Sequence, residues 1–256
     1  MDRTEISRLA HTAHPIAAPV AGRHVEVLLS RLSAPAGGRV LDLGCGSGEW
    51  LMELLAERPG LTGVGVDVAL PGDVAPSAAA RGVADRVSWV EADAVSWSGG
   101  LFDVVFCIGA SHAFGGLPGT LEGVRRHLRP GGQVLLGDTI WEAPPSPAAQ
   151  EALEAGPDDL PDLRGLVAAA QDCGFEPGYG HVSTAEEWDD YEWSWTGSLA
   201  EWALHDAPGD QAREQALEAA RAHRDAWLRG YRHQLGFVTL VLNDTRALQQ
   251  GSTTSP

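Results

Sequence analysis

Three glycines between a short apolar run and a helix-forming segment are the residues with the clearest chemical purpose in this chain. Residues 40–43 are typical of a buried strand, and residues 49–57 are typical of a helix. Gly44, Gly46 and Gly48 lie between them and predict a tight turn, in which the backbone can approach a ligand closely. The free N–H groups of the following helix would point at that ligand. This order of elements predicts a nucleotide-binding site.

The spacing of the glycines narrows the kind of nucleotide. Dinucleotide sites use Gly-x-Gly-x-x-Gly, but the position of the third glycine in that pattern is occupied here by Glu49. The Gly-x-Gly-x-Gly spacing, with Asp42 just before it, resembles motif I of class I S-adenosylmethionine (SAM)-dependent methyltransferases. The resemblance implies that the turn packs against the ribose and the methionine end of SAM, with Asp42 near its positive charges.

Two more acids lie at the ends of predicted strands, in the order along the chain that is typical of class I SAM-dependent methyltransferases. Asp67 ends the apolar run at residues 61–67, and Asp93 lies in the run at residues 87–95. The resemblance implies that Asp67 binds the ribose hydroxyls and that Asp93 reaches the adenine amine. A turn-capping role for Asp93 and a turn-bracing role for Asp42 remain open. The resemblance also implies cofactor contacts from Gly44, Cys45, Gly46, Val68, Ala94 and Ile108.

The later part of the predicted core follows the same family order. Residues 102–109 and 133–139 read as further strands, and the second follows Leu-Arg-Pro-Gly-Gly. The resemblance covers about residues 36–140, and residues 107–116 are similar to a bacterial group of stand-alone methyltransferases. That group often has Glu-Pro in place of Asp138-Thr139, so the resemblance assigns no role to Asp138. It implies an α/β fold, with a Rossmann-like, seven-stranded, mostly parallel sheet flanked by helices.

The rest of the chain is expected to add helices around this core. Residues 1–35 are broken by prolines and predict an N-terminal helical lid. The core is expected at residues 36–184 and 236–248, with a final strand at residues 236–243. Strong helix formers at residues 185–235 predict a helical cap, inserted before the last strand and placed over the active-site face. Residues 249–256 are polar and are expected to be a disordered tail.

The amino-acid composition limits which binding partners and which cellular compartment are expected. The net charge is −17, and all 18 basic residues are arginine, so nucleic acids and anionic membranes are poor partners and a P-loop is excluded. The three cysteines are far apart, which argues against disulfides and a zinc site, and we expect no metal. No signal peptide or membrane-spanning run is apparent, so we expect a cytoplasmic protein, either a monomer or a homodimer.

His112 is the best candidate for a general base. It follows the fourth predicted strand in Gly-Ala-Ser-His, where class I enzymes often place groups that contact the substrate. Imidazole exchanges protons near neutral pH, and Ser111 beside it is a second candidate for substrate contact. The alternative is a histidine that only shapes the loop.

His11 and His14 could share one face of a short helix before Pro15. N-terminal helices often cover the site in this family, so the resemblance implies a lid role for both. A metal site is weakly supported because no cysteine or carboxylate near them in the sequence completes a ligand set. An ordinary surface helix is the remaining alternative.

The predicted cap is rich in aromatic and acidic residues at positions 186–202. Aromatic faces beside carboxylates can hold a cationic amine, which makes Trp188 and Tyr191 candidate substrate contacts. The simpler interpretation, which the helical spacing favours, is that the rings pack the cap and the acids face water. Trp227 and Tyr231, one turn apart on the next helix, are expected to pack against the same face. Trp141, after the fifth strand, is a candidate pocket wall.

These features together predict an enzyme that transfers the methyl group of SAM to a small-molecule nucleophile (N, O or C) by in-line displacement, leaving S-adenosylhomocysteine (SAH). A SAM-binding sensor without activity is one alternative. A nicotinamide-dependent oxidoreductase is another, but Glu49 and the absence of lysine argue against it.

Overall fold

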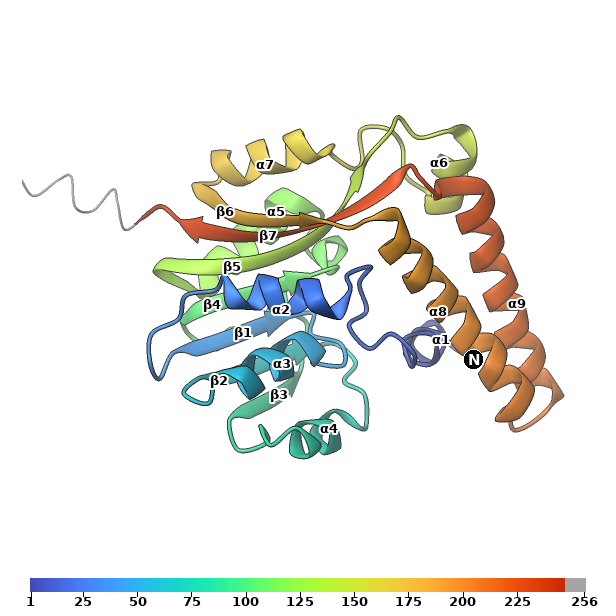
Figure 1. Ribbon diagram of the computed structural model, residues 1–256, viewed down its shortest axis with the longest axis horizontal. Coiled ribbons are helices and arrows are strands. Elements are labelled where there is room, and N and C mark those ends of the chain that lie inside the picture. The colour runs from blue at the N-terminus through green and yellow to red at the C-terminus, as the bar shows by residue number, and fades with distance from the viewer. Residues whose placement is uncertain (247–256) are drawn as a thin grey trace, which may run out of the picture. The chain divides into compact units, whose positions relative to one another are not determined.

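A seven-stranded sheet with strand order β3-β2-β1-β4-β5-β7-β6 forms the centre of the fold (Figure 1). The strands are parallel from β3 through β5, and β6 pairs antiparallel with β7, which confirms the predicted mostly parallel sheet. The strand bounds are β1 Arg39–Leu43, β2 Thr62–Asp67, β3 Val87–Glu91, β4 Phe102–Ile108, β5 Leu128–Trp141, β6 Phe175–Val182 and β7 Leu235–Asp244.

The computed structural model describes residues 1–246, so the predicted tail at residues 249–256 lies outside the described residues. Within the described chain, two compact units are distinguished. The sheet unit contains residues 22–138, 164–182 and 238–246, and the helical unit contains residues 1–21, 139–163 and 183–237. None of the helices in residues 1–246 is both long and apolar enough to cross a membrane.

Helices of the sheet unit form where apolar residues recur at helical spacing. Helix α3 (Glu49–Glu57) has the predicted bounds and buries five side chains, Trp50, Leu51, Met52, Leu54 and Leu55. Its N-cap is Gly48 in the left-handed conformation, so the last glycine of the turn also starts the helix. The other helices of this unit are α2 Gly22–Ser30, α4 Val74–Ala80, α5 Leu117–His127 and α7 Leu163–Asp172, with a short 3₁₀ turn η1 at Ser111–Phe114.

The helical unit contains the whole of the predicted cap, residues 185–235. Helix α8 (Ala185–His205) begins at a capping box in which the Thr184 hydroxyl and the Glu187 carboxylate each bind the other's backbone N–H. Helix α9 (Asp210–Ala226) runs into a π-helical turn, η2 (Trp227–Tyr231). The unit also contains α1 (Arg3–Ala10) and α6 (Pro147–Leu153). Residues 185–235 are thus mainly helical, as the sequence predicts.

The division into units differs from the predicted boundaries in two places. The predicted lid, residues 1–35, is divided, because residues 1–21 cluster with the helical unit while α2 clusters with the sheet unit. Residues 139–163, expected in the core, cluster with the helical unit. Sequence patterns locate helices, but the contacts that divide a chain into units involve distant residues.

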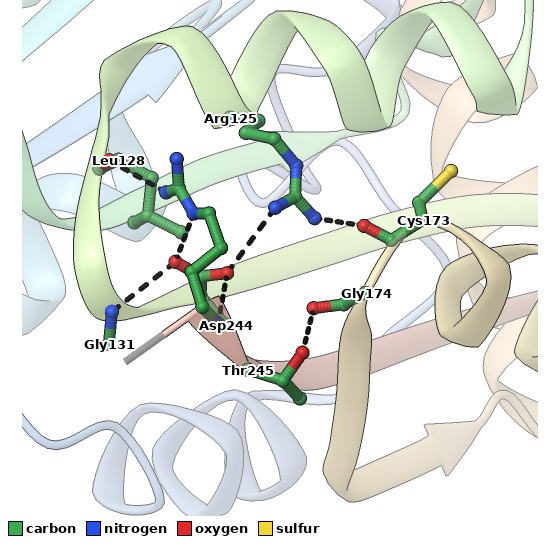
Figure 2. A network of polar contacts seen from close by, with 8 residues as sticks. Arg125, Leu128, Gly131, Cys173, Gly174, Asp244 and Thr245 are labelled. Atoms are coloured by element: carbon green, nitrogen blue, oxygen red, sulfur yellow. Dashed lines mark hydrogen bonds and ion pairs between the residues drawn. The ribbon is translucent and has the colours of Figure 1, made fainter. Parts of the chain in front are cut away.

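Buried polar contacts hold the end of β7 in the sheet unit (Figure 2). The Asp244 side chain is fully buried, and its two oxygens accept hydrogen bonds from Arg125 (3.4 Å) and Arg246 (2.7 Å). Gly131 N–H also donates to Asp244, at 3.3 Å, and Arg125 donates to the Cys173 carbonyl. One carboxylate therefore joins α5, β5 and β7. These partners compensate the cost of burying its charge.

Candidate functional site

The glycine turn after β1 has the strained backbone that its sequence predicts. Gly44, Gly46 and Gly48 have φ values of 75°, 50° and 75°, a region that residues with a Cβ rarely adopt. Gly44 N–H donates to the carbonyl of Val66 on β2 at 2.8 Å. A Cβ at Gly44 would lie 2.5 Å from that of Ala110, so the turn packs tightly against the loop after β4. A Cβ at Gly46 would meet nothing within 4 Å, so this middle glycine faces open space.

The carboxylate of Asp67, at the end of β2, is bound to this turn. Its Oδ2 accepts a hydrogen bond from Gly46 N–H at 2.8 Å, and its Oδ1 accepts one from Ala69 N–H at 3.0 Å. Two backbone donors therefore set the orientation of the carboxylate. Each carboxylate oxygen has a second lone pair, so the group can still accept two hydrogen bonds from a ligand.

Asp42 lies on β1 beneath the same turn and is buried. Burial, as the main cause, and the negative charge of Asp67, as the second, together raise the pKa of Asp42 to about 7. Asp42 and Asp67 form no ion pair within residues 1–246, so the site holds uncompensated negative charge. Burial also raises the pKa of the Cys45 and Cys107 thiols, which keeps both cysteines protonated and unreactive.

The remaining predicted cofactor residues lie at or just after the ends of β2, β3 and β4. Asp93 is exposed, and its Oδ1 accepts a hydrogen bond from Val95 N–H at 2.9 Å, so it does cap a turn. Its Oδ2 has no partner among the described residues. Val68, next to Asp67, has 69% of its surface exposed, which is unusual for an apolar side chain. Ala94 is buried, and Ile108 is half-buried at the end of β4.

The loop after β4 carries the predicted base. His112 is exposed in the 3₁₀ turn, and its imidazole has no hydrogen-bond partner among the described residues. The neighbouring Ser111 hydroxyl donates to Asp138 Oδ1 at 2.8 Å, and Asp138 is buried on β5. Asp138 therefore positions the loop that carries His112, a role that the sequence pattern did not assign to it.

The helical unit brings the predicted lid and cap residues together. His11 Nε2 lies 3.0 Å from the Tyr191 hydroxyl, and the His14 ring meets the Tyr191 ring edge-on, with centroids 5.5 Å apart. Trp188 also packs edge-on against Tyr191, at 6.1 Å between centroids. Two histidines that are distant in sequence and one nearby tryptophan therefore surround Tyr191. Their predicted roles as lid and substrate contacts remain predictions.

One expectation for the cap is wrong for two of its acids. Glu187 and Glu192 do not face water but are buried, with 5% and 2% of their surfaces exposed. Glu192 accepts a hydrogen bond from the Tyr231 hydroxyl at 2.8 Å and lies 2.8 Å from His223 Nε2, so it is fully partnered. A buried carboxylate is tolerated only with such partners.

Trp227 and Tyr231, expected to pack against the face that carries Trp188, belong to a buried cluster against which Trp188 packs. Trp227 also packs edge-on against Trp193, at 5.3 Å between centroids. The ring of Trp141, the predicted pocket wall, is 5% exposed and packs with Trp227 in a buried cluster. Its indole N–H donates to the Gly156 carbonyl at 3.2 Å, so the structure gives Trp141 a packing role.

The sequence reasoning missed a residue that supports the turn. The indole of Trp89, on β3, fills the space beside Gly48 and Gly65, where any Cβ would collide with it. The two glycines are thus needed for packing as well as for backbone conformation. The signal in the sequence was a glycine in one strand, at Gly65, and a tryptophan in the next strand, at Trp89. A glycine within a strand often marks a place where a neighbouring group approaches closely.

Comparison with known proteins agrees with this geometry. The model of the methyltransferase domain family matches residues 20–180. The uncharacterized protein YjhP of Escherichia coli is 31% identical over 85% of this chain and 90% of its own length, and its crystal structure superposes with a TM-score of 0.82. A SAM-dependent methyltransferase from Thiobacillus denitrificans, solved with SAH, is 29% identical over 94% of this chain and 99% of its own, with a TM-score of 0.83. The 27-O-demethylrifamycin SV methyltransferase of Amycolatopsis mediterranei is 29% identical over 78% of this chain and 72% of its own length.

Proposed function

The chain belongs to the methyltransferase domain family as a SAM-dependent methyltransferase, and we propose that its methyl acceptor is a small-molecule nucleophile. We assign the site chiefly from the hydrogen bond of 2.8 Å that Gly46 N–H donates to Asp67. It joins the glycine turn after β1 to the acid that ends β2, the two places where a Rossmann-like sheet holds a nucleoside.

The charges of the sheet unit suit SAM. The ammonium and sulfonium groups of SAM are positive, and Asp42, Asp67 and Asp93 have no cationic partner among residues 1–246. The buried Asp42 carboxyl, whose pKa is raised to about 7, would be stabilised in its charged form by a nearby cation. The donor set and the open space above Gly46 therefore fit the cofactor.

We assign the cofactor contacts residue by residue. Asp67, held by two backbone N–H groups, would accept hydrogen bonds from the ribose hydroxyls with its remaining lone pairs. Asp93 Oδ2 would accept one from the adenine amine. The exposed side chain of Val68 would provide apolar surface for the adenine ring. The remaining proposed contacts are Gly44, Cys45, Gly46, Ala94 and Ile108.

When bound, SAM supplies a methyl group on a sulfonium sulfur that a nucleophile attacks in line. The protein has to hold the acceptor and exclude water, so a base is needed only for an acceptor that is protonated at the working pH. We propose that His112 accepts this proton, because its imidazole is unpartnered and lies on a loop positioned by the Ser111–Asp138 hydrogen bond. Ser111 would contact the substrate beside it.

Two observations support a small acceptor. The net charge of −17 is repulsive toward nucleic acids. The relative from Amycolatopsis is named for 27-O-demethylrifamycin SV, which is a small molecule. We place the enzyme in the cytoplasm, which is compatible with its three free cysteines, Cys45, Cys107 and Cys173.

The test uses SAM labelled on its methyl group. The purified protein is incubated with a metabolite extract from the source cells, beside an Asp67→Ala variant. We expect label in a small-molecule fraction with the parent protein and none with the variant. Binding of SAM without any labelled product would favour a sensor, and label in protein or nucleic acid would contradict the proposed acceptor class.

A further inference from the structure

The helical unit contains a small cavity that shares only Trp188 with the predicted substrate contacts. Its volume is about 80 Å³, and its walls include the rings of Trp188, Trp227 and Tyr231. The charged residues Glu142, Asp189 and Arg232 also line it. An engineered cavity of ~150 Å³ is large enough for benzene, so this one takes a group smaller than a benzene ring.

The aromatic walls are held in place by contacts within the unit. Tyr231 is 5% exposed, and its hydroxyl is already bound to the buried Glu192 at 2.8 Å. Tyr231 can therefore offer the cavity its ring but not its hydroxyl. Trp227 is 1% exposed and rests edge-on against Trp193. These rings lose little freedom on binding a ligand, which favours affinity.

The charges around the cavity leave one carboxylate without a partner. Arg232 binds Asp189 through two hydrogen bonds of 2.9 Å and 2.7 Å, so the charges of this pair compensate each other. The Glu142 side chain makes no hydrogen bond or ion pair among the described residues. His233 is the remaining titratable lining residue. With a neutral imidazole, the lining carries a net charge of −1, which attracts a cation and repels an anion.

One contact in the structure shows that the aromatic wall accommodates positive charge. The guanidinium carbon of Arg232 lies 5.8 Å from the centroid of the Trp227 ring, near the ~6 Å limit for a cation–π interaction. Asp189 neutralises that guanidinium, so it does not oppose a second cation near Glu142. Aromatic rings together with an unpaired carboxylate form a typical recognition site for ammonium groups.

We propose that this cavity binds the ammonium headgroup of a small organic cation, with Glu142 as its counter-ion and the rings of Trp188, Trp227 and Tyr231 around it. The proposal goes beyond methyl transfer and does not depend on it. Binding can therefore be measured without SAM, and failure of either proposal leaves the other standing.

The experiment is calorimetric titration of the whole chain with ethylammonium at pH 8, because this cation is smaller than a benzene ring. The comparison ligand is ethanol, an alcohol of similar size that has no charge. We expect ethylammonium to bind at least about tenfold more tightly than the alcohol, since a cation–π site with a counter-ion discriminates by charge. Equal affinities, or no binding of ethylammonium at 10 mM (roughly the weakest range of a useful site), would overturn the proposal.

A matched pair of variants locates the site. Glu142→Gln removes the counter-ion and should weaken ethylammonium binding by about five- to tenfold while leaving the binding of the alcohol unchanged. Glu151→Gln removes an exposed acid of the same unit that does not line the cavity, and it should bind ethylammonium like the parent. Equal effects of the two substitutions would place the cation elsewhere and overturn the proposal.

Discussion

The backbone N–H of Gly46 donates a hydrogen bond of 2.8 Å to Oδ2 of Asp67, across 21 residues of sequence. The bond links the loop after β1 to the end of β2, two neighbouring parallel strands. It fixes the carboxylate before any cofactor is present. Preorganisation of this kind lowers the entropy cost of binding.

Replacing Asp67 should abolish tight cofactor binding. Asp67→Ala removes the acceptor for Gly46 and Ala69 as well as the proposed ribose contact, so we expect SAH affinity to fall by about 100-fold. Calorimetric titration with SAH measures this directly. Asp85→Asn, a substitution of an exposed acid in the same unit, should bind SAH like the parent. Unchanged affinity in Asp67→Ala would remove the basis of the proposed site.

Asp42 should make the stability depend on pH in a defined direction. Its pKa is raised to about 7 in the folded chain, mainly by burial, whereas an unfolded aspartate titrates near ~3.9. Between these values the folded chain keeps a proton that the unfolded chain has released. The contribution of Asp42 therefore weakens the fold as the pH rises from about 4 to about 7, and the loss is complete above that range.

Asp42→Asn removes this titration. The variant should gain roughly 2–4 kcal/mol in free energy of unfolding relative to the parent at pH 8, and little at pH 4. Urea unfolding at the two pH values gives the comparison, with Asp85→Asn as the exposed control. If the difference in free energy of unfolding between variant and parent is the same at both pH values, the raised pKa of Asp42 is contradicted.

The glycines of the turn should differ in their tolerance of alanine. Gly46→Ala meets no atom within 4 Å but has a φ of 50°, so it should cost about 1–2 kcal/mol through backbone strain alone. Gly44→Ala adds a contact of 2.5 Å with the Cβ of Ala110, so overpacking should raise its cost by a further ~1–3 kcal/mol. Chemical unfolding of both variants measures these losses in free energy of unfolding. Equal costs would show that Ala110 moves away freely.

Asp244 should be a strong stabilising residue of the sheet unit. Asp244→Ala leaves Arg125 and Arg246 without their carboxylate, and we expect a loss of about 2–4 kcal/mol in free energy of unfolding. Asp225→Ala breaks the ion pair with Arg229, whose side chains are 58% and 79% exposed, and should cost below about 1 kcal/mol. The same urea titration measures both. Similar losses would mean that burial does not strengthen the Asp244 contacts.

The parts of the site that could be predicted from sequence depend on neighbours in the chain. The glycine turn, the strand before it and the helix at Glu49–Glu57 agree with the structure because positive φ values and apolar spacing are local properties. The burial of Glu192 could not be predicted. It depends on His223 and Tyr231, which are 31 and 39 residues away in the sequence.

The sequence by itself determined the glycine turn, the strand and the helix on either side of it, and the acids Asp42 and Asp67 near the ends of β1 and β2. Only the tertiary structure decided that Asp138 holds Ser111, that Trp141 belongs to a buried cluster, and that an unpaired Glu142 lines an aromatic cavity. Backbone conformation follows from adjacent residues, whereas burial and pairing are set by side chains that only folding brings into contact.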